Sequence, residues 1–367
     1  LLIIISGKSW IYKAISITYL QGYTSSYIED FIHFPSNKIE AGAHQAWEIS
    51  KDYNQIKLSE KIKLINDRLE TTAFVVIQHD SIVFEEYWHG YTADSSSNSF
   101  SITKSWVAAL IGVAIKEGKI KGVNEKVCTF LPDYFKGISD QLVIQDLLTM
   151  SASLNWYEDY YNPFGQTAQA YYGSDLRKLI MELEVLPGSG KTFKYNSAST
   201  QILTYILENA VGETISTYAS KKLWKPMGSK NSAIWNLDNL EGDEKGFCCI
   251  NSNARDLARL GKLYINKGNW NGRQILDTSF VESSTSIANI LDRRGTKNKN
   301  YGYHFWIADY NEMKVYYSRG LWGQYMICIP EKNIIIVRLG RKQGEILENG
   351  HYSDFYQFLN AGIEICR

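Results

Sequence analysis

The sequence has no excess charge of either sign and no long apolar run. Its 39 basic residues balance 39 acidic ones among 367 residues, so electrostatics give no reason to expect nucleic acid or an anionic membrane as a partner. The apolar start, LLIII, is too short to span a bilayer, which takes about 20 residues. It fits a short strand, or the remnant of a signal peptide or of a membrane anchor upstream of residue 1. An exported bacterial protein and a cytoplasmic one are both consistent with it.

Cysteine is scarce and shows no ligand-like spacing. The five cysteines are odd in number and include no C-x-x-C, which argues against a disulfide framework and against a structural zinc site. Two of them are adjacent, and neighbours rarely bond each other, so we expect all five to be free or buried thiols: Cys128, Cys248, Cys249, Cys328 and Cys366. The SGKS stretch at residues 6–9 is not a phosphate-binding loop, because a leucine stands where the first glycine is required.

The hydrophobic pattern predicts strands near both ends of the chain and helices between them. Residues 73–90 indicate two strands around a turn, and 322–340 indicate a hairpin. Strands from both ends would then share one sheet. We therefore expect an α/β (α+β) fold, an antiparallel sheet flanked by helices, with an inserted mainly helical domain. The expected division is an N-terminal extension at 1–55, a sheet domain at 56–115 and 236–367, and a helical insertion at 116–235. Further strands are expected at 301–308 and 313–320, and helices at 59–70, 99–118, 140–150, 175–184, 199–211, 214–224, 253–268 and 353–366.

The chain contains one S-x-x-K sequence, from Ser101 to Lys104, where polar residues give way to an apolar helix. The free N–H groups at a helix N-terminus favour negative charge on or near the serine, and one turn brings Lys104 to the same face. A lysine with the ordinary pKa of about 10.4 is a poor base at neutral pH. Partial burial would lower that pKa and free the amine to act as a base. The alternative is a capping serine and a surface lysine, and the motif alone does not decide between them.

Two further segments carry candidate residues. Tyr195-Asn196-Ser197 precedes a helix, where a tyrosine could hold a phenolate or relay a proton; the alternative is a packing tyrosine followed by a capping serine. Gly320 and Gly323 mark a close backbone approach in a strand. Exposed N–H groups there could complete an oxyanion hole, and the alternative is a simple bulge.

The order S-x-x-K, Y-x-S, G-x-W-G-Q over residues 70–345 resembles the serine hydrolases of the β-lactamase and penicillin-binding-protein fold. The resemblance is closer to the branch of 6-aminohexanoate-dimer hydrolases and related carboxylesterases, and residues 143–163 and 253–268 agree with it. It implies an acyl-enzyme on a small ester, amide or peptide substrate, with no metal and no organic cofactor. No G-x-S-x-G, H-E-x-x-H or phosphate-loop motif competes with this reading.

The resemblance also implies roles for individual residues. Ser101 would be the nucleophile, Lys104 its base, and Tyr195 a second proton carrier that protonates the leaving group. The backbone N–H groups of Ser101 and Leu321 would form the oxyanion hole. Four more residues would contact the substrate: Tyr160, Ser197, Gly320 and Trp322. Glu158 and Asp159, which precede Tyr160, are expected in a solvated loop.

The third motif departs from the β-lactamase pattern. Where that branch has K-[ST]-G, with a lysine that meets the substrate carboxylate, this chain has Ser318-Arg319-Gly320. Because side chains alternate along a strand, the sequence leaves open whether Arg319 faces the site. Ser197 also stands where class C β-lactamases carry asparagine. Both departures favour ester or amide hydrolysis over a D-Ala-D-Ala carboxypeptidase or β-lactamase, and a catalytically silent binding protein of the same fold is the remaining alternative. Nothing in the sequence indicates an oligomeric state.

Overall fold

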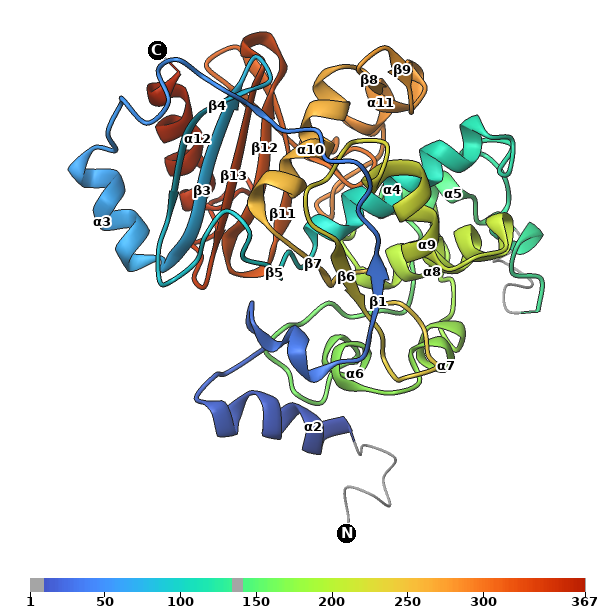
Figure 1. Ribbon diagram of the computed structural model, residues 1–367. Helices are drawn as coiled ribbons and strands as arrows, with labels where there is room; N and C mark the ends of the chain where they lie inside the picture. The colour runs from blue at the N-terminus through green and yellow to red at the C-terminus, as the bar shows by residue number, and fades with distance from the viewer. Residues whose placement is uncertain (1–9, 134–140, 367) are drawn as a thin grey trace.

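A computed structural model describes residues 10–133 and 141–366. A large twisted sheet with helices on both of its faces lies beside a mainly helical region (Figure 1). The apolar first five residues, for which an anchor or a strand was considered, lie outside the described residues. Within the described ranges, no helix combines the length and the apolar character that crossing a membrane requires.

The large sheet joins strands from both ends of the chain, as the hydrophobic pattern predicted. Its order is β10–β11–β12–β13–β3–β4–β2, and every neighbouring pair is antiparallel except β2 with β4. The bounds are β2 (Glu48–Ile49), β3 (Thr71–Gln78), β4 (Ser81–Tyr87), β10 (Trp306–Tyr310), β11 (Met313–Gly320), β12 (Gln324–Ile329) and β13 (Ile334–Gly340).

The two central strands, β3 and β13, are buried on both faces, which explains their almost continuous apolar sequences. Successive side chains point to opposite faces of a strand. Val76 and Ile336 therefore pack under the C-terminal helix α12 (Ser353–Ile365), while Val75 and Val337 join the core on the side of α10 (Ala254–Ile265). The helix α3 (Glu60–Arg68) lies on the same face as α12 (Figure 1).

The strand predicted for residues 301–308 is shorter than expected. It begins at Trp306, because His304 adopts a positive φ of 57° that interrupts an extended chain. This bend brings the carbonyl oxygen of His304 within 2.6 Å of Ser105 Oγ, which donates a hydrogen bond to it. The irregular segment thus ties the edge of the sheet to the helix that follows Ser101.

The helical region is built around α4 (Ile102–Lys116), which packs along α8 (Ser197–Val211). Both helices are largely buried, which their apolar sequences require. The helices around them are α2 (Trp10–Ile17), α5 (Ile144–Leu148), α6 (Gln166–Tyr172), α7 (Leu176–Met181), α9 (Ile215–Ala219), the π-helix η5 (Ser220–Trp224) and α11 (Thr278–Ser284). The predicted domain boundaries at 56, 116 and 236 stay predictions.

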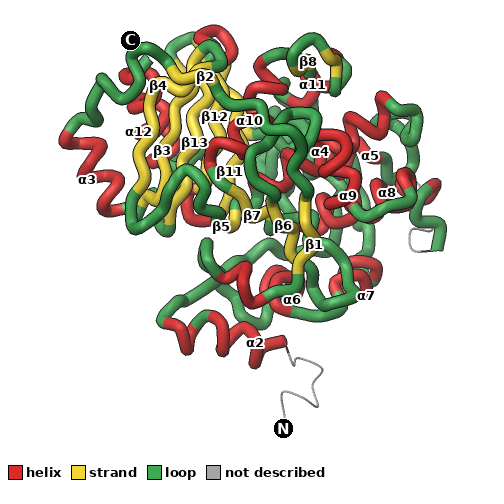
Figure 2. The backbone as a smooth tube through the Cα atoms, in the orientation of Figure 1, coloured by secondary structure: helices red, strands yellow, loops and turns green. Residues whose placement is uncertain are grey.

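A second, four-stranded sheet was not predicted (Figure 2). Its order is β1 (Ser36–Ile39), β6 (Ala233–Asn236), β7 (Ile250–Ser252), β5 (Ser97–Asn98), and a two-stranded ribbon, β8 (Asn269–Trp270) with β9 (Arg273–Gln274), lies elsewhere. Strands of two to four residues leave little periodicity in a sequence. The sheet matters for the site because β5 delivers the chain directly to Ser101.

Candidate active site

Ser101 lies at the N-cap of α4, where the motif predicted it. Its side chain makes no capping hydrogen bond to the helix, and Lys104 is only 1% exposed. The alternative of a capping serine and a surface lysine is therefore wrong. Because α4 is buried from Ile102 through Ala114, the helix fixes both side chains at one end of a packed core.

The ammonium nitrogen of Lys104 meets three oxygen atoms. Nζ lies 3.0 Å from Ser101 Oγ, 3.2 Å from Ser197 Oγ and 2.5 Å from the carbonyl oxygen of Phe247. Burial lowers the pKa of Lys104 to about 8, and the negative charge of Glu158 opposes part of that shift. A fraction of the molecules near neutral pH therefore carries a neutral amine beside the serine hydroxyl.

Tyr195 comes just before Asn196, the N-cap of α8, and faces the same pair. Its ring centroid lies 5.4 Å from Lys104 Nζ, and its ring stacks on Trp306 with centroids 5.7 Å apart. Burial raises the pKa of Tyr195, the charge of Glu158 raises it further, and a hydrogen bond with Ser101 acts in the opposite direction. The side chain is thus a protonated phenol, able to donate a proton but not poised as a phenolate.

Glu158 lies in a loop, as expected, but it is half-buried and both oxygens of its carboxylate are hydrogen-bonded, so the expectation that it is solvated is wrong. Its Oε1 accepts a hydrogen bond from Ser197 Oγ at 2.6 Å. Its Oε2 accepts from the backbone N–H of Ser197 at 2.7 Å and from Trp156 Nε1 at 2.6 Å. Sequence reasoning missed this carboxylate because its main partner is 39 residues away in the chain.

The end of β11 passes close to the segment before Ser101. A Cβ atom on Gly320 would lie 2.3 Å from the carbonyl oxygen of Ser99, so only glycine permits this approach. The chain then turns through Trp322, which has a positive φ of 63°. Nη1 of Arg338 holds the turn through the carbonyl oxygens of Trp322 and Gly323, each at 2.9 Å.

The side chains of this third motif divide between two faces. Ser318, at the position of the missing lysine, donates a hydrogen bond to Ser105 Oγ at 2.7 Å and points into the core. Arg319 points the other way and lines a cavity beside Ser101, which answers the question that strand alternation left open. Its guanidinium lies over the rings of Trp306, 3.8 Å from the centroid, and Tyr352, 4.7 Å from the centroid.

Two cavities meet at Ser101, Tyr160 and Leu321, which line both of them. The apolar cavity is lined in addition by Ser25, Ser26, Phe100, Thr167, Ala168, Tyr171, Tyr172, Ser197, Phe247 and Cys248. The polar cavity is lined in addition by Tyr161, Tyr195, Arg319, Gly320, Gln343 and Tyr352. The serine therefore stands at the junction of two spaces of different chemistry.

The four residues predicted to contact the substrate differ in their position relative to the two cavities. Tyr160 lines both cavities, Ser197 the apolar one and Gly320 the polar one. Trp322 is not among the residues that line either cavity. Its indole Nε1 donates a hydrogen bond to the carbonyl oxygen of Ser26 at 2.6 Å, and its contact with substrate stays a prediction.

The N-terminal extension closes one wall of the apolar cavity. Ser25 Oγ donates a hydrogen bond to the carbonyl oxygen of Tyr160 at 3.2 Å, and the bond from Trp322 to Ser26 anchors the next residue. Residues 25–26 thus bridge the Tyr160 loop and the turn after β11. The sequence of the extension, without a clear period, offered no signal for this role.

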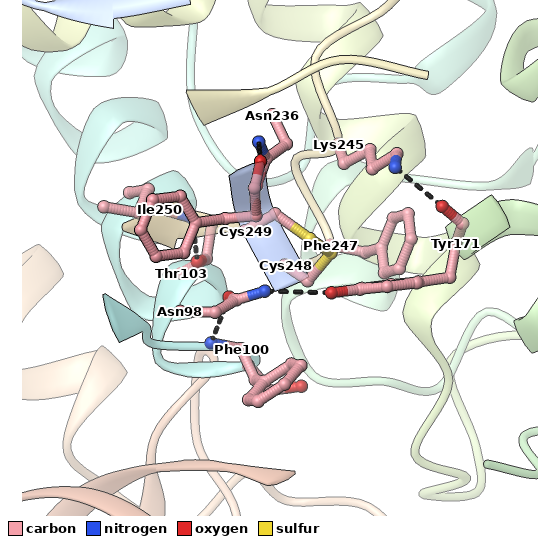
Figure 3. Close-up of a disulfide and its surroundings, with 12 residues drawn as sticks. Asn98, Phe100, Thr103, Tyr171, Asn236, Lys245, Phe247, Cys248, Cys249 and Ile250 are labelled. Atoms are coloured by element: carbon pink, nitrogen blue, oxygen red, sulfur yellow. Dashed lines mark hydrogen bonds between the residues drawn. A yellow bond between two sulfur atoms is a disulfide. The ribbon is translucent and has the colours of Figure 1, made fainter. Parts of the chain in front are cut away.

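Cys248 and Cys249 form a disulfide, which corrects the expectation that all five cysteines are thiols (Figure 3). The chain reverses at Cys249, which has a positive φ of 79°, and this turn lets two consecutive side chains meet. Cys248 lines the apolar cavity, and the preceding carbonyl, that of Phe247, is the one that accepts from Lys104. The three remaining cysteines are free, as predicted: Cys128, Cys328 and Cys366.

Comparison with known proteins agrees with this geometry. The profile of the beta-lactamase family matches residues 58–352, so the chain belongs to the beta-lactamase family. Among curated proteins it is 28% identical to a 6-aminohexanoate-dimer hydrolase of Paenarthrobacter ureafaciens over 309 residues, 77% of this chain and 76% of that protein. It is 24% identical to an N-acetylmuramyl-L-alanine amidase of Bacillus subtilis over 286 residues, 62% of this chain and 64% of that protein.

Solved structures show the same fold. A Bacillus anthracis protein proposed to be a 6-aminohexanoate-dimer hydrolase superposes with a TM-score of 0.77 at 22% identity, covering 98% of this chain and 95% of that one. A family VIII carboxylesterase superposes with a TM-score of 0.64 at 13% identity, covering 88% and 99%. The resemblance drawn from the three motifs is therefore confirmed for the family and for the β-lactamase/transpeptidase-like fold.

Proposed function

We propose that this chain is a serine hydrolase that cleaves an ester or amide bond of a small substrate through an acyl-enzyme on Ser101. The observation that carries the proposal is the 3.0 Å distance from Ser101 Oγ to a buried Lys104 whose pKa is lowered to about 8. A neutral amine at that distance is a base that can take the serine proton. The hydrolases among the relatives support the same class of reaction.

In the first step, Ser101 Oγ attacks the carbonyl carbon while its proton moves to Lys104 Nζ. The carbonyl oxygen becomes an oxyanion that accepts hydrogen bonds from the backbone N–H groups of Ser101 and Leu321, and one donor of this kind is worth about 3–4 kcal/mol. The bond to the leaving group then breaks as Tyr195 gives its phenolic proton to the departing oxygen or nitrogen. The proton held by Lys104 restores the phenol, and water releases the acyl group by the same transfers in reverse.

The position of Tyr195 orients the substrate. Because Tyr195 lines the polar cavity, the leaving group belongs there, and the acyl group belongs in the apolar cavity. Tyr160, which lines both cavities, would lie beside the bond that breaks. Gly320 keeps the strand close enough for its backbone to reach the substrate.

The alternative of a D-Ala-D-Ala carboxypeptidase or β-lactamase has less support. The lysine of the third motif is absent, and Ser318 in its place donates its hydroxyl proton to Ser105 Oγ. A catalytically silent binding protein would not require a buried amine 3.0 Å from a serine hydroxyl.

The test is turnover of 4-nitrophenyl acetate and of a penicillin by the wild type, by Ser101→Ala and by Ser96→Ala as a control in the loop before the motif. We expect ester turnover that falls at least about 1,000-fold in Ser101→Ala only. Turnover of the penicillin as well would move the protein toward cell-wall peptidases and β-lactamases. An active Ser101→Ala variant would contradict the proposal, and a wild type inert toward both substrates would favour a binding protein.

A further inference from the structure

We infer that Glu158 is a positioning residue of this site, which acts through the Ser197 hydroxyl to aim the lone pair of Lys104 at Ser101. The inference rests on the proposed function. It is carried by a continuous chain of contacts: Ser101 Oγ to Lys104 Nζ at 3.0 Å, Nζ to Ser197 Oγ at 3.2 Å, and Ser197 Oγ to Glu158 Oε1 at 2.6 Å.

The direction of each hydrogen bond follows from the chemistry of its groups. An ionised carboxylate only accepts, so Ser197 must give its single hydroxyl proton to Glu158. Toward Lys104, Ser197 then offers a lone pair and nothing else. The carbonyl oxygen of Phe247, 2.5 Å from Nζ, is also an acceptor only.

These two acceptors decide where the neutral amine keeps its lone pair. Once Lys104 loses a proton, it has two N–H groups and one lone pair. The N–H groups are drawn to Phe247 and Ser197, and among the hydrogen-bond partners of Nζ in the described part of the chain Ser101 is the one left. The lone pair therefore faces the hydroxyl whose proton it has to accept.

Other contacts fix Glu158 in this role. Its second oxygen accepts from Trp156 Nε1 and from the backbone N–H of Ser197. Ser197 is the first residue of α8, and a carboxylate is favoured at a helix N-terminus. The carboxylate is thus held on two sides and cannot turn away from Ser197 without losing these bonds.

Glutamine at position 158 would reverse the direction of the hydrogen bonds from residue 158 through Ser197 to Lys104. It would leave the positions of these side chains unchanged. The amide oxygen would stay on the two N–H donors, Trp156 Nε1 and Ser197 N, and the NH₂ group would face Ser197 Oγ. The Ser197 proton would then turn toward Lys104 and occupy the lone pair. Glu158→Gln should accordingly remove the base from Ser101 and leave the packing intact.

The decisive experiment is a double-mutant cycle of Glu158→Gln and Ser197→Ala, measured as kcat with an activated aryl ester. We expect Glu158→Gln to lower kcat about 100-fold with little change in KM, because base catalysis is lost and binding is not. In the Ser197→Ala background, where the hydroxyl that carries the effect is absent, the same change should cost less than about threefold. Ser197→Ala alone should lower kcat about tenfold, because one N–H of Lys104 loses its acceptor.

Asp159→Asn is the matched control, because it removes a neighbouring carboxylate that binds the backbone of Tyr161 and Asn162 instead of the site. We expect it to leave kcat within about twofold of the wild type. Thermal melting of every variant checks the fold. If Glu158→Gln does not fold, Ser197→Ala decides alone, and an unchanged kcat there would overturn the inference.

The pH profile distinguishes two effects of Glu158: orientation of the Lys104 lone pair through Ser197, and a direct electrostatic effect of its charge on Lys104. Titratable groups facing Lys104 are Glu158, Tyr195 and His304, and burial lowers the pKa of His304 to about 3, which keeps it neutral. Loss of the Glu158 charge would lower the pKa of Lys104 further. The acidic limb of the kcat–pH profile would then move to lower pH, both with Ser197 present and in Ser197→Ala. An equal loss of kcat with and without Ser197, whatever the limb does, would overturn the inference. A wild type without activity would instead refute the proposed function.

Discussion

The two cavities that meet at Ser101 differ in what they can bind. The apolar cavity is walled by aromatic rings, the Cys248–Cys249 disulfide and the N-terminal extension at residues 25–26. The polar cavity is lined by Arg319 and by several tyrosines. The described ion pairs include no carboxylate partner for Arg319, whereas Arg341 nearby in the sequence is paired with Glu29.

This difference indicates how one serine can treat the two halves of a substrate differently. An uncharged acyl group loses little on leaving water for the apolar cavity, whereas a charged one would have no partner there. A leaving group that carries a negative charge would find Arg319. Ser101 lies at the junction, so in the proposed mechanism Ser101 and its base Lys104 should act on both halves alike.

The largest effect should come from the junction itself. Lys104→Met removes the base and should lower kcat about 1,000-fold for every ester tested, whatever its acyl or leaving group. Lys116→Met, at the far end of the same helix and exposed, is the control and should be close to wild type. Steady-state kinetics with a panel of esters measures both. A loss confined to one type of ester would contradict the expectation that Lys104 acts alike on both halves of the substrate.

The dependence on pH should be the next largest effect. Lys104 acts as a base only when neutral, so kcat/KM should rise with pH and level off above its pKa of about 8. Between pH 6 and the plateau the rise should approach about 100-fold, tenfold for each pH unit below the pKa. Profiles for esters with neutral and anionic leaving groups should share this limb. A limb that falls with increasing pH over this range would contradict a neutral amine as the base.

Arg319→Ala tests whether Arg319 gives the polar cavity its expected preference for anionic leaving groups. A hydrogen bond to a charged group is worth about 1.5–3 kcal/mol, so KM for an ester with a carboxylate on its leaving group should rise about 10- to 100-fold. The matching uncharged ester should change by less than about twofold, which makes it the internal control. An equal rise in both KM values would show that Arg319 supports the structure of the cavity and not its charge preference.

Narrowing the apolar cavity should give the smallest effect. Ala168 on α6 lines this cavity, and Ala168→Leu would occupy space that an acyl chain needs. We expect kcat/KM for a butyrate ester to fall about tenfold, since one or two methylene groups are worth about 1–3 kcal/mol in a pocket. An acetate ester with the same leaving group should be nearly unaffected. If acetate and butyrate fell together, the acyl group would not lie in this cavity.

Local sequence was enough to predict that Ser101 and Lys104 lie side by side. One helical turn joins Ser101 to Lys104 regardless of the surrounding fold, whereas the position of Tyr195 beside them was expected only from the resemblance to the family. Local sequence also predicted the long strands β3 and β13, because their apolar runs are continuous. These features depend on residues that are close together in the chain.

The long-range contacts around Ser101 and Lys104 could not be predicted from local sequence. Glu158 reaches Ser197 across 39 residues, and the N-terminal extension reaches Trp322 across 296. The disulfide depends on a positive φ at Cys249, which no composition rule indicates. Such features follow from how distant segments pack, and a single sequence carries no direct signal for them.

Acylation of Ser101, with Lys104 as its base, is the step on which the proposed mechanism depends. The most direct measurement is peptide mass mapping after a brief incubation with an activated aryl ester and an acid quench, on the wild type and Ser101→Ala, at pH 6 and pH 8. We predict an acyl group on the peptide that contains Ser101, more of it at pH 8, and none in Ser101→Ala. An acyl group on another residue, or equal labelling of Ser101→Ala, would contradict the account.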